Sequence, residues 1–202
     1  MKKLFFCLIA VLTALSASAE FRWGPTAGLN INNYYWKQPL LKSDYRCGVN
    51  AGILGELMIP GIGFGVDMGL MYNMHSGSVD LGSHPVWSND GYTDTDITLH
   101  TVQIPVHLRF KWTRMNGVEQ YIAPFAYVGP AFCFTAAQSK CAAIEHPAGN
   151  VGLQFGLGAE IIEHIQFSVC YQWGVSYELR TVKLDNLSAR GSSWNINIAY
   201  LF

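Results

Sequence analysis

Apolar and polar side chains alternate along the last ten residues of the chain, from Ser193 to Phe202. One parity carries large apolar residues such as Trp194 and Ile196, and the other carries mostly small or polar residues such as Asn195. Because side chains along a strand point alternately to opposite faces, this segment is predicted to be a strand with one apolar and one polar face. It ends on an aromatic residue, as the last strand of bacterial outer-membrane barrels commonly does.

The same alternation recurs upstream, so the sequence predicts eight strands. They cover residues 21–31, 46–58, 62–73, 101–112, 121–135, 150–161, 165–178 and 193–202. In the fifth strand, aromatic residues occupy both parities, and its facing is left undecided. Pro105 in the fourth strand cannot donate a backbone hydrogen bond, so a bulge or a broken pairing is predicted there.

The predicted connections alternate in length. Those after the second, fourth and sixth strands are short turns at Pro60-Gly61, Asn116-Gly117 and Glu163-His164, whereas residues 32–45, 75–95, 136–148 and 180–192 form long polar loops. Short turns at one end and long loops at the other are typical of outer-membrane barrels. The predicted fold is therefore all-β, an eight-stranded antiparallel up-and-down transmembrane β-barrel with both termini in the periplasm.

The polar face distinguishes this barrel from a soluble sandwich or a lipocalin-like barrel. It is rich in glycine, with Ser, Asn, Gln and a few charges, which suits the crowded interior of a narrow barrel better than a solvated exterior. The apolar face would then contact lipid. Aromatic residues near the predicted strand ends fit the girdles at the two membrane interfaces: Trp23, Tyr72, Trp112, Trp173, Tyr177, Trp194, Tyr200 and Phe202.

Composition supports a membrane location. Only 13% of the 202 residues are charged, against about 25% in ordinary soluble domains, and 50% are hydrophobic. The formal charge of −1 gives no indication of a nucleic-acid partner. Beyond the N-terminal segment there is no long apolar run, so the chain is expected to cross the membrane by strands.

Residues 1–19 are predicted to be a cleaved signal peptide. Lys2 and Lys3 precede an apolar run over residues 4–15, and small residues precede a cleavage site between Ala19 and Glu20. The apolar run is shorter than the roughly 20 residues that a spanning helix needs, which argues against a membrane anchor. Residues 20–202 are expected to form the mature outer-membrane barrel domain.

Charged residues and one histidine fall on the inward parity of the predicted strands. We expect them to pair as a structural network that plugs the lumen, because isolated ions in so narrow a space are costly; a proton or solute path is the alternative. The predicted network is Arg22, Arg46, Glu56, Asp67, His107, Arg109, Lys111, Glu160 and Glu178.

The remaining candidate chemistry is sparse. Cys133 and Cys141 flank the third long loop and form a candidate disulfide in an oxidising compartment, whereas Cys170 faces inward and Cys47 outward without an obvious partner. No cofactor or metal site is predicted. A lipid hydrolase would need a nucleophile beside an outward-facing histidine, and His100 has no serine beside it on its strand face. The chain is therefore predicted not to be an enzyme.

The chain resembles the small outer-membrane β-barrel proteins of the Bacteroidetes type, a group that includes PorT-like and OmpX-like proteins. The resemblance is carried by short motifs in order along the strands: residues 27–30 (AGLN), 103–106 (QIPV), 128–130 (VGP), 156–159 (GLGA) and 199–202 (AYLF). It implies a location in the outer membrane of a Gram-negative bacterium and a barrel architecture, and it supplies no catalytic residue.

Three functional classes follow from this interpretation. The first is a structural or surface-binding barrel whose four extracellular loops contact an outside partner. The second is an accessory of a protein-secretion or envelope-assembly system, and the third is a lipid-active enzyme. The expected partners are outer-membrane lipid, the barrel-assembly machinery acting through the C-terminal strand that ends at Phe202, and an extracellular or secretion-machinery protein.

Overall fold

A computed structural model describes residues 20–37, 43–59, 61–80, 93–113, 117–139, 144–145, 147–181 and 187–202. The strands are β1 Glu20–Trp36, β2 Ser43–Met58, β3 Phe64–Asp80, β4 Asp94–Lys111, β5 Ile122–Gln138, β6 Ile144–Glu145, β7 Gly149–Ile161, β8 Ile165–Gly174, β9 Leu179–Thr181 and β10 Ser188–Tyr200. A short 3₁₀ helix, η1 Val118–Gln120, precedes β5. In this part of the chain, no helix is long and apolar enough to cross a membrane.

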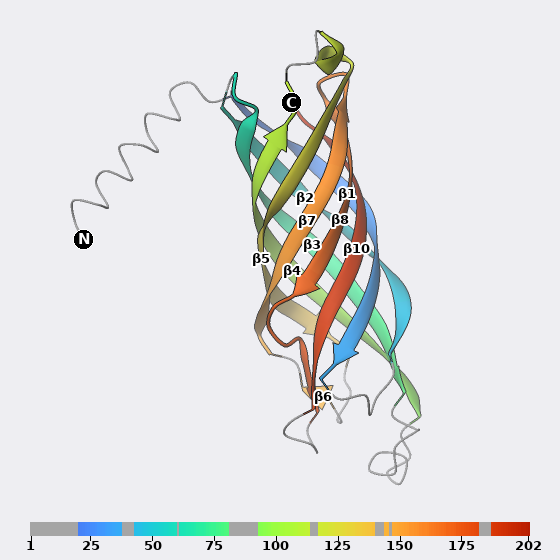
Figure 1. Cartoon of the computed structure of the whole chain (residues 1–202). Helices are drawn as coiled ribbons and strands as arrows, with labels where there is room; N and C mark the ends of the chain where they lie inside the picture. The colour runs from blue at the N-terminus through green and yellow to red at the C-terminus, as the bar shows by residue number, and fades with distance from the viewer. Residues whose placement is uncertain are drawn as a thin grey trace, which may run out of the picture.

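The eight long strands close into an antiparallel barrel, as the alternation predicted (Figure 1). Each pairs with its neighbours along the chain, and β1 also pairs with β10, from Thr26 opposite Ala199 to Trp36 opposite Ala189. Closure leaves the long strands without a free edge, so their backbone groups are satisfied within the sheet. The two short strands lie beyond the end of β8, where β9 pairs with β10 and β6 pairs with β9.

The first and last described residues lie at the same end of the barrel, together with η1 and the β7–β8 connection; we call this the turn end and the opposite one the loop end (Figure 1). The Phe202 amide donates to the Trp23 carbonyl there. The predicted β7–β8 turn is present, and its residues Ile162 and Glu163 have φ of 51° and 60°. Both values lie in the left-handed region of a type I′ hairpin turn, which is strained for residues other than glycine.

The outward face is apolar and the inward face is polar, the reverse of a soluble protein. Leu29 is 62% exposed while the adjacent Asn30 is 0% exposed, and Met68 is 59% exposed beside Asp67 at 1%. This repeating contrast along the strands confirms the predicted facing. It requires an apolar medium around the barrel, because such a large exposed apolar surface is unusual on a soluble monomer.

Several strands are longer at the loop end than the sequence indicated, whereas β8 ends at Gly174, short of the predicted residue 178. On β3 the large apolar outward residues extend from Phe64 to Tyr72, a length that suits a tilted crossing of a bilayer. The strand then continues to Asp80, and the positions of outward parity there are half-buried Ser76 and buried Ser78. The predicted loop over residues 75–95 is therefore wrong at both edges, because a strand beyond the apolar band no longer shows alternation and resembles a loop in sequence.

Residues 32–45 and 180–192 show the same difference. β1 continues to Trp36, β2 begins at Ser43, and β10 begins at Ser188. The prediction for Pro105 is confirmed: the pairing of β3 with β4 is interrupted there and resumes in the same register, because proline has no amide hydrogen to donate.

Candidate functional site

The strand register places charged side chains at one level of the lumen, near the turn end. Arg22 lies opposite Glu56 across β1 and β2, and Glu56 lies opposite Asp67 across β2 and β3. Glu160 is brought to the same region by β7, opposite Gln166 on β8. Neighbouring strands thus bring residues that are far apart in the sequence into one cluster.

Glu56 is the centre of this cluster and is 0% exposed. Its Oε1 accepts hydrogen bonds from Arg22 Nη2 at 2.6 Å and Lys111 Nζ at 2.7 Å. Its Oε2 accepts from Arg109 Nη1 at 2.7 Å and Gln166 Nε2 at 2.6 Å. All the contacts are charge-assisted, which makes them stronger than bonds between neutral groups.

Two further carboxylates complete the cluster. Glu160 accepts from Arg22 Nη2 and Lys111 Nζ, both at 2.8 Å, and Asp67 accepts from Arg109 Nε at 2.6 Å. Three cations therefore meet three carboxylates: Arg22, Arg109 and Lys111 with Glu56, Asp67 and Glu160. Charge balance matters here, because a buried ion without a partner is strongly destabilising.

Aromatic rings from β5 support this cluster from the side. The Arg109 guanidinium carbon lies 4.0 Å from the centroid of the Phe125 ring, a cation–π contact. The facing of the fifth strand, which the sequence left undecided, is thus settled with Phe125 and Tyr127 inside. Room for their rings comes from β7, where Gly158 lies opposite Phe125 and Gly156 opposite Tyr127.

The two glycines are required by close approach. A Cβ on Gly158 would lie 2.4 Å from the Phe125 ring, and one on Gly156 would lie 2.1 Å from the Tyr127 ring. Any larger side chain would displace the aromatic residue opposite. The glycine-rich inward face is therefore complementary to the two rings.

A layer of amides lies farther toward the loop end. Gln172 Oε1 accepts from Gln103 Nε2 at 3.0 Å and from Gln154 Nε2 at 2.8 Å, and Asn73 donates to Gln103. Gln154 Oε1 lies 2.7 Å from His107 Nε2. These neutral groups satisfy one another without requiring a counter-ion, so they fill the lumen at lower desolvation cost than further charges.

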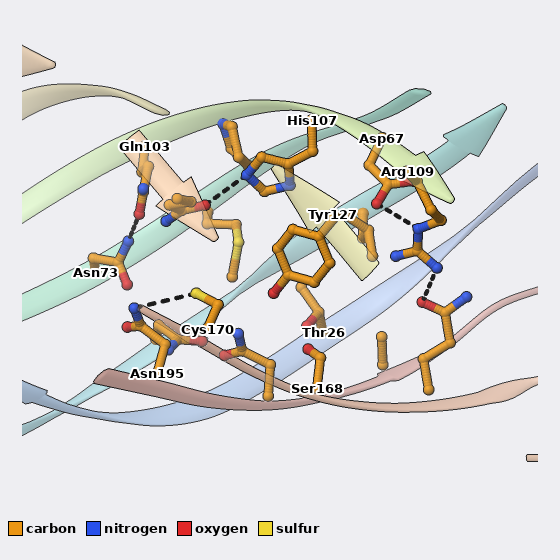
Figure 2. Close-up of a pocket in the computed structure, with 18 residues that line it drawn as sticks. Thr26, Asp67, Asn73, Gln103, His107, Arg109, Tyr127, Ser168, Cys170 and Asn195 are labelled. Atoms are coloured by element: carbon orange, nitrogen blue, oxygen red, sulfur yellow. Dashed lines mark hydrogen bonds and ion pairs between the residues drawn. The ribbon is translucent and has the colours of Figure 1, made fainter. Parts of the chain in front are cut away.

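A small cavity of about 50 Å³ lies between the charge cluster and the amide layer, with Tyr127 projecting across it (Figure 2). It has room for a few water molecules, since one water needs roughly 10–15 Å³ by this measure. Three oxygens at its wall, Asn50 Oδ1, Asp67 Oδ1 and Asn197 Oδ1, have no hydrogen-bond partner among the described residues. They provide the polar contacts that enclosed water would need.

The loop end of the lumen has a buried histidine–glutamate hydrogen bond and an apolar core. His75 Nδ1 lies 3.0 Å from Glu178 Oε1, and both side chains are 6% exposed. Around this pair, apolar side chains that are at most 1% exposed are Val79, Ile97, Leu99, Leu179, Leu187 and Ala189. Charged, amide and apolar layers therefore fill the lumen in succession, which favours a plug over a solute path.

The predicted network is divided by the structure. Arg22, Glu56, Asp67, Arg109, Lys111 and Glu160 form the charge cluster, His107 joins the amide layer, and Glu178 pairs with His75. Arg46 is a correction: it lies near the loop end, where its side chain is 51% exposed and pairs with exposed Asp96 at 2.9 Å. The register of β2 on β3 shifts between Tyr45 and Asn50, so the alternation counted along the sequence does not hold at Arg46.

Some predictions fall on residues outside the described part of the chain. Cys141 is one of them, so the Cys133–Cys141 disulfide stays a prediction; Cys133 itself is buried and Cys170 faces inward, as expected. Ala19 and the rest of residues 1–19 also lie outside it, so signal cleavage before Glu20 stays a prediction.

Sequence reasoning missed the amides and the apolar core at the loop end. Gln103, Gln154 and Gln172 share the inward parity of their strands, so parity was an available signal for them. Ile97 and Leu99 lie between the predicted loop over residues 75–95 and the predicted strand over residues 101–112 and were assigned to neither, because polar residues such as Thr98 and Asp96 occupy the outward positions beside them. This part of β4 has no apolar outer face, so the sequence shows no alternation there from which a strand could be predicted.

Histidine chemistry on the outer surface is limited in the described structure. His100 faces outward on β4, where its Nδ1 lies 2.5 Å from the Tyr72 hydroxyl and its ring stacks on Tyr72. No serine, threonine or cysteine hydroxyl or thiol of the described residues bonds to it. Nor do three His, Cys, Asp or Glu side chains of this part of the chain gather to hold a metal ion.

Solved structures of outer-membrane proteins share this architecture. OprG from Pseudomonas aeruginosa aligns with a TM-score of 0.55 at 13% identity, covering 91% of this chain and 95% of that chain. Ail, the attachment invasion locus protein of Yersinia pestis, was solved with the heparin analogue sucrose octasulfate. It aligns with a TM-score of 0.45 at 12% identity, covering 91% of this chain and 99% of that chain. Neisserial surface protein A aligns with a TM-score of 0.45 at 11% identity, covering 91% of this chain and 99% of that chain.

At these identities the likeness to OprG shows the fold and not the function. No curated protein sequence matches the chain. A family match is found, to the outer membrane protein beta-barrel domain, over residues 4–202. Since the match covers nearly the whole sequence, and the structure is a closed barrel with an apolar exterior, the chain belongs to this family of outer-membrane β-barrel proteins.

Proposed function

We propose that this protein is a non-enzymatic, non-conducting barrel of a Gram-negative outer membrane that presents its loop end to the outside as a binding surface. Both termini would then lie in the periplasm. The observation that carries the proposal is the ordered extension of the strands beyond the apolar band. β3 and β4 continue to Asp80 and Asp94 with polar outward positions, above buried Val79 and Ile97.

The extension is more structure than membrane anchoring requires. A strand needs about 9–11 residues to cross a bilayer, whereas β3 and β4 have 17 and 18. Long loops on a rigid scaffold are where binding residues are commonly found. The filled lumen supports a surface role over transport, because an eight-stranded barrel leaves room for side chains and little else.

The test replaces the long loops while keeping the strands. Residues 38–42, 81–92, 140–143 and 182–186 would be exchanged for short turns, and cells carrying the variant would be compared with wild type for adhesion to panels of immobilised glycans and proteins. Adhesion should be lost while heat-modifiable gel migration, which reports a closed barrel, is retained. Unchanged adhesion of the folded variant would contradict the proposal.

An accessory role in protein secretion or envelope assembly is the second candidate, favoured by the resemblance of residues 103–106 and 199–202 to PorT-like proteins of the Bacteroidetes type. The same loop variants discriminate it. Loss of secreted proteins from the medium would support this role, and intact secretion would argue against it. An enzymatic role on lipid is tested by His100→Ala, which should leave the lipid A pattern of the membrane unchanged.

Recognition by the barrel-assembly machinery is proposed to use the C-terminal strand. Phe202 is 62% exposed on the outer surface, and its ring lies 5.7 Å from that of Trp23 and 5.1 Å from that of Tyr200. Because this terminal aromatic side chain points outward, the assembly machinery could contact it without reaching any residue of the lumen.

A further inference from the structure

A second site lies on the outer wall of the barrel, just beyond the apolar band at the loop end. A pocket of about 530 Å³ is formed there between β1, β10 and the segment that follows β8. The side chains considered below are Tyr35, Lys37, Trp173, Tyr177, Ser188 and Arg190. None of them belongs to the lumen network.

The strand register fixes the cations of this pocket side by side. Tyr35 on β1 lies opposite Arg190 on β10, and the Lys37 amide donates to the Ser188 carbonyl at 3.0 Å. Lys37 and Arg190 thus occupy diagonal positions on neighbouring strands, where the Cα atoms of two residues are about 7–8 Å apart. Both long side chains can reach one ligand between them, beside the hydroxyl of Ser188.

The two cations lack an acidic partner within the described residues. Arg22, Arg46, Arg109 and Lys111 each form an ion pair with a carboxylate, whereas no such pair is formed by Lys37 or Arg190 in the described part of the chain. The Arg190 guanidinium instead lies 5.2 Å from the centroid of the Tyr177 ring, which orients it without neutralising it. Two adjacent cations that repel each other favour an anion between them.

The position of the pocket along the membrane normal indicates which kind of anion it would meet. Arg190 has the same outward parity as Trp194 on β10 and lies four residues nearer the loop end. Trp173 on β8 and Trp194 both lie at the edge of the apolar band that faces the loop end. Trp and Tyr at such an edge mark the headgroup level of a bilayer. A cationic pocket continuous with lipid-facing aromatic residues is complementary to an anionic lipid headgroup.

We infer that this pocket binds a phosphate group of an outer-leaflet glycolipid, with Lys37, Arg190 and Ser188 on the phosphate and Tyr35 and Trp173 beside the sugar and acyl boundary. The inference rests on the proposed orientation, which places the loop end in the outer leaflet. It adds a specific lipid ligand to the proposed surface role. The occupant is the lipid headgroup rather than free phosphate, because the pocket opens onto the apolar band.

The test uses the mature protein folded in detergent, with diphosphoryl lipid A as the probe and native mass spectrometry to count bound lipid. Lys37→Gln/Arg190→Gln should weaken binding by about 30-fold, since each cation near an anionic lipid surface contributes about fivefold. The control, Arg46→Gln, removes one exposed charge from β2, outside the pocket, and should stay within about twofold of wild type, whereas Lys37→Gln and Arg190→Gln should each weaken binding about fivefold.

Two further arms identify the ligand. Dephosphorylated lipid A should bind wild type and Lys37→Gln/Arg190→Gln equally weakly, and inorganic phosphate should not displace diphosphoryl lipid A. Equal loss in Arg46→Gln and in the Lys37→Gln or Arg190→Gln variants, no loss in any pocket variant, or full displacement by inorganic phosphate would each overturn the inference. The variant with short loops keeps all the pocket residues, so it should still bind lipid A even if it shows that the proposed surface role is wrong.

Discussion

Replacing Glu56 by glutamine is expected to destabilise the barrel more than any exposed charge change. Glu56 is fully buried and accepts hydrogen bonds from Arg22, Arg109, Lys111 and Gln166 at 2.6–2.7 Å. Glutamine has nearly the same shape but carries no charge. Its amide NH₂ would also face donors at one of the two oxygen positions.

The magnitude follows from these contacts. A hydrogen bond to a charged group contributes about 1.5–3 kcal/mol, roughly twice a neutral one, so weakening four of them costs about 3–6 kcal/mol. The change also leaves three cations with two carboxylates, Asp67 and Glu160. Removing one partner from a buried ion pair costs about 3–5 kcal/mol, so both routes give a similar loss in the free energy of unfolding.

The assay is urea unfolding of the protein folded in lipid vesicles, followed by tryptophan fluorescence and by heat-modifiable migration. Glu56→Gln/Lys111→Met removes the excess cation and should recover most of the loss, because exchanging a complete buried pair for uncharged groups is often neutral. Arg46→Gln is the control and should cost less than about 1 kcal/mol, since its pair with Asp96 is exposed. A loss below about 1 kcal/mol for Glu56→Gln, or no recovery in the double variant, would refute the role assigned to the cluster.

Other expectations follow from packing, backbone strain, lumen filling and assembly. Gly156→Ala should lower the free energy of unfolding by about 1–3 kcal/mol, because its Cβ would meet the Tyr127 ring, and Tyr127→Leu in the same chain should recover part of that loss; urea curves without the loss would contradict the packing. Ile162→Asn should raise the free energy of unfolding by about 1 kcal/mol, since asparagine tolerates the φ of 51°, and a lower midpoint would argue against strain in the turn. In planar bilayers the protein should show no steady conductance, and a stable open level would disprove the filled lumen. Deleting Phe202 should reduce the heat-modifiable fraction in isolated outer membranes, whereas an unchanged fraction would remove the case for recognition of the terminal strand.

The membrane-crossing part of the fold was predictable because lipid imposes a regular constraint. Each crossing strand must present apolar residues at every second position, so the alternation that ends at Tyr200 and Phe202 identified both the strands and their outer face. The parts that escaped prediction lie beyond that constraint. Above the apolar band, β3 and β4 meet water on their outer side, and their buried Val79 and Ile97 no longer alternate with apolar neighbours.

The candidate site was predictable in kind but not in arrangement. Parity placed Glu56 and Arg109 inside, because parity depends only on the local strand. Parity does not say that Arg109 contacts Glu56, that Phe125 fits against Gly158, or that Arg46 reaches solvent. Those relations depend on the register between strands.

A barrel with a polar interior and an apolar exterior can be inferred from the amino-acid order, because the alternation is repeated along every strand. Which charges neutralise one another in the lumen, and which cations, such as Lys37 and Arg190, lie together on the outer wall, follows only from how the strands pair. The physical reason is that hydrophobic alternation is a one-dimensional property, whereas pairing depends on strand tilt and register, through which closure of the barrel brings distant residues to one level.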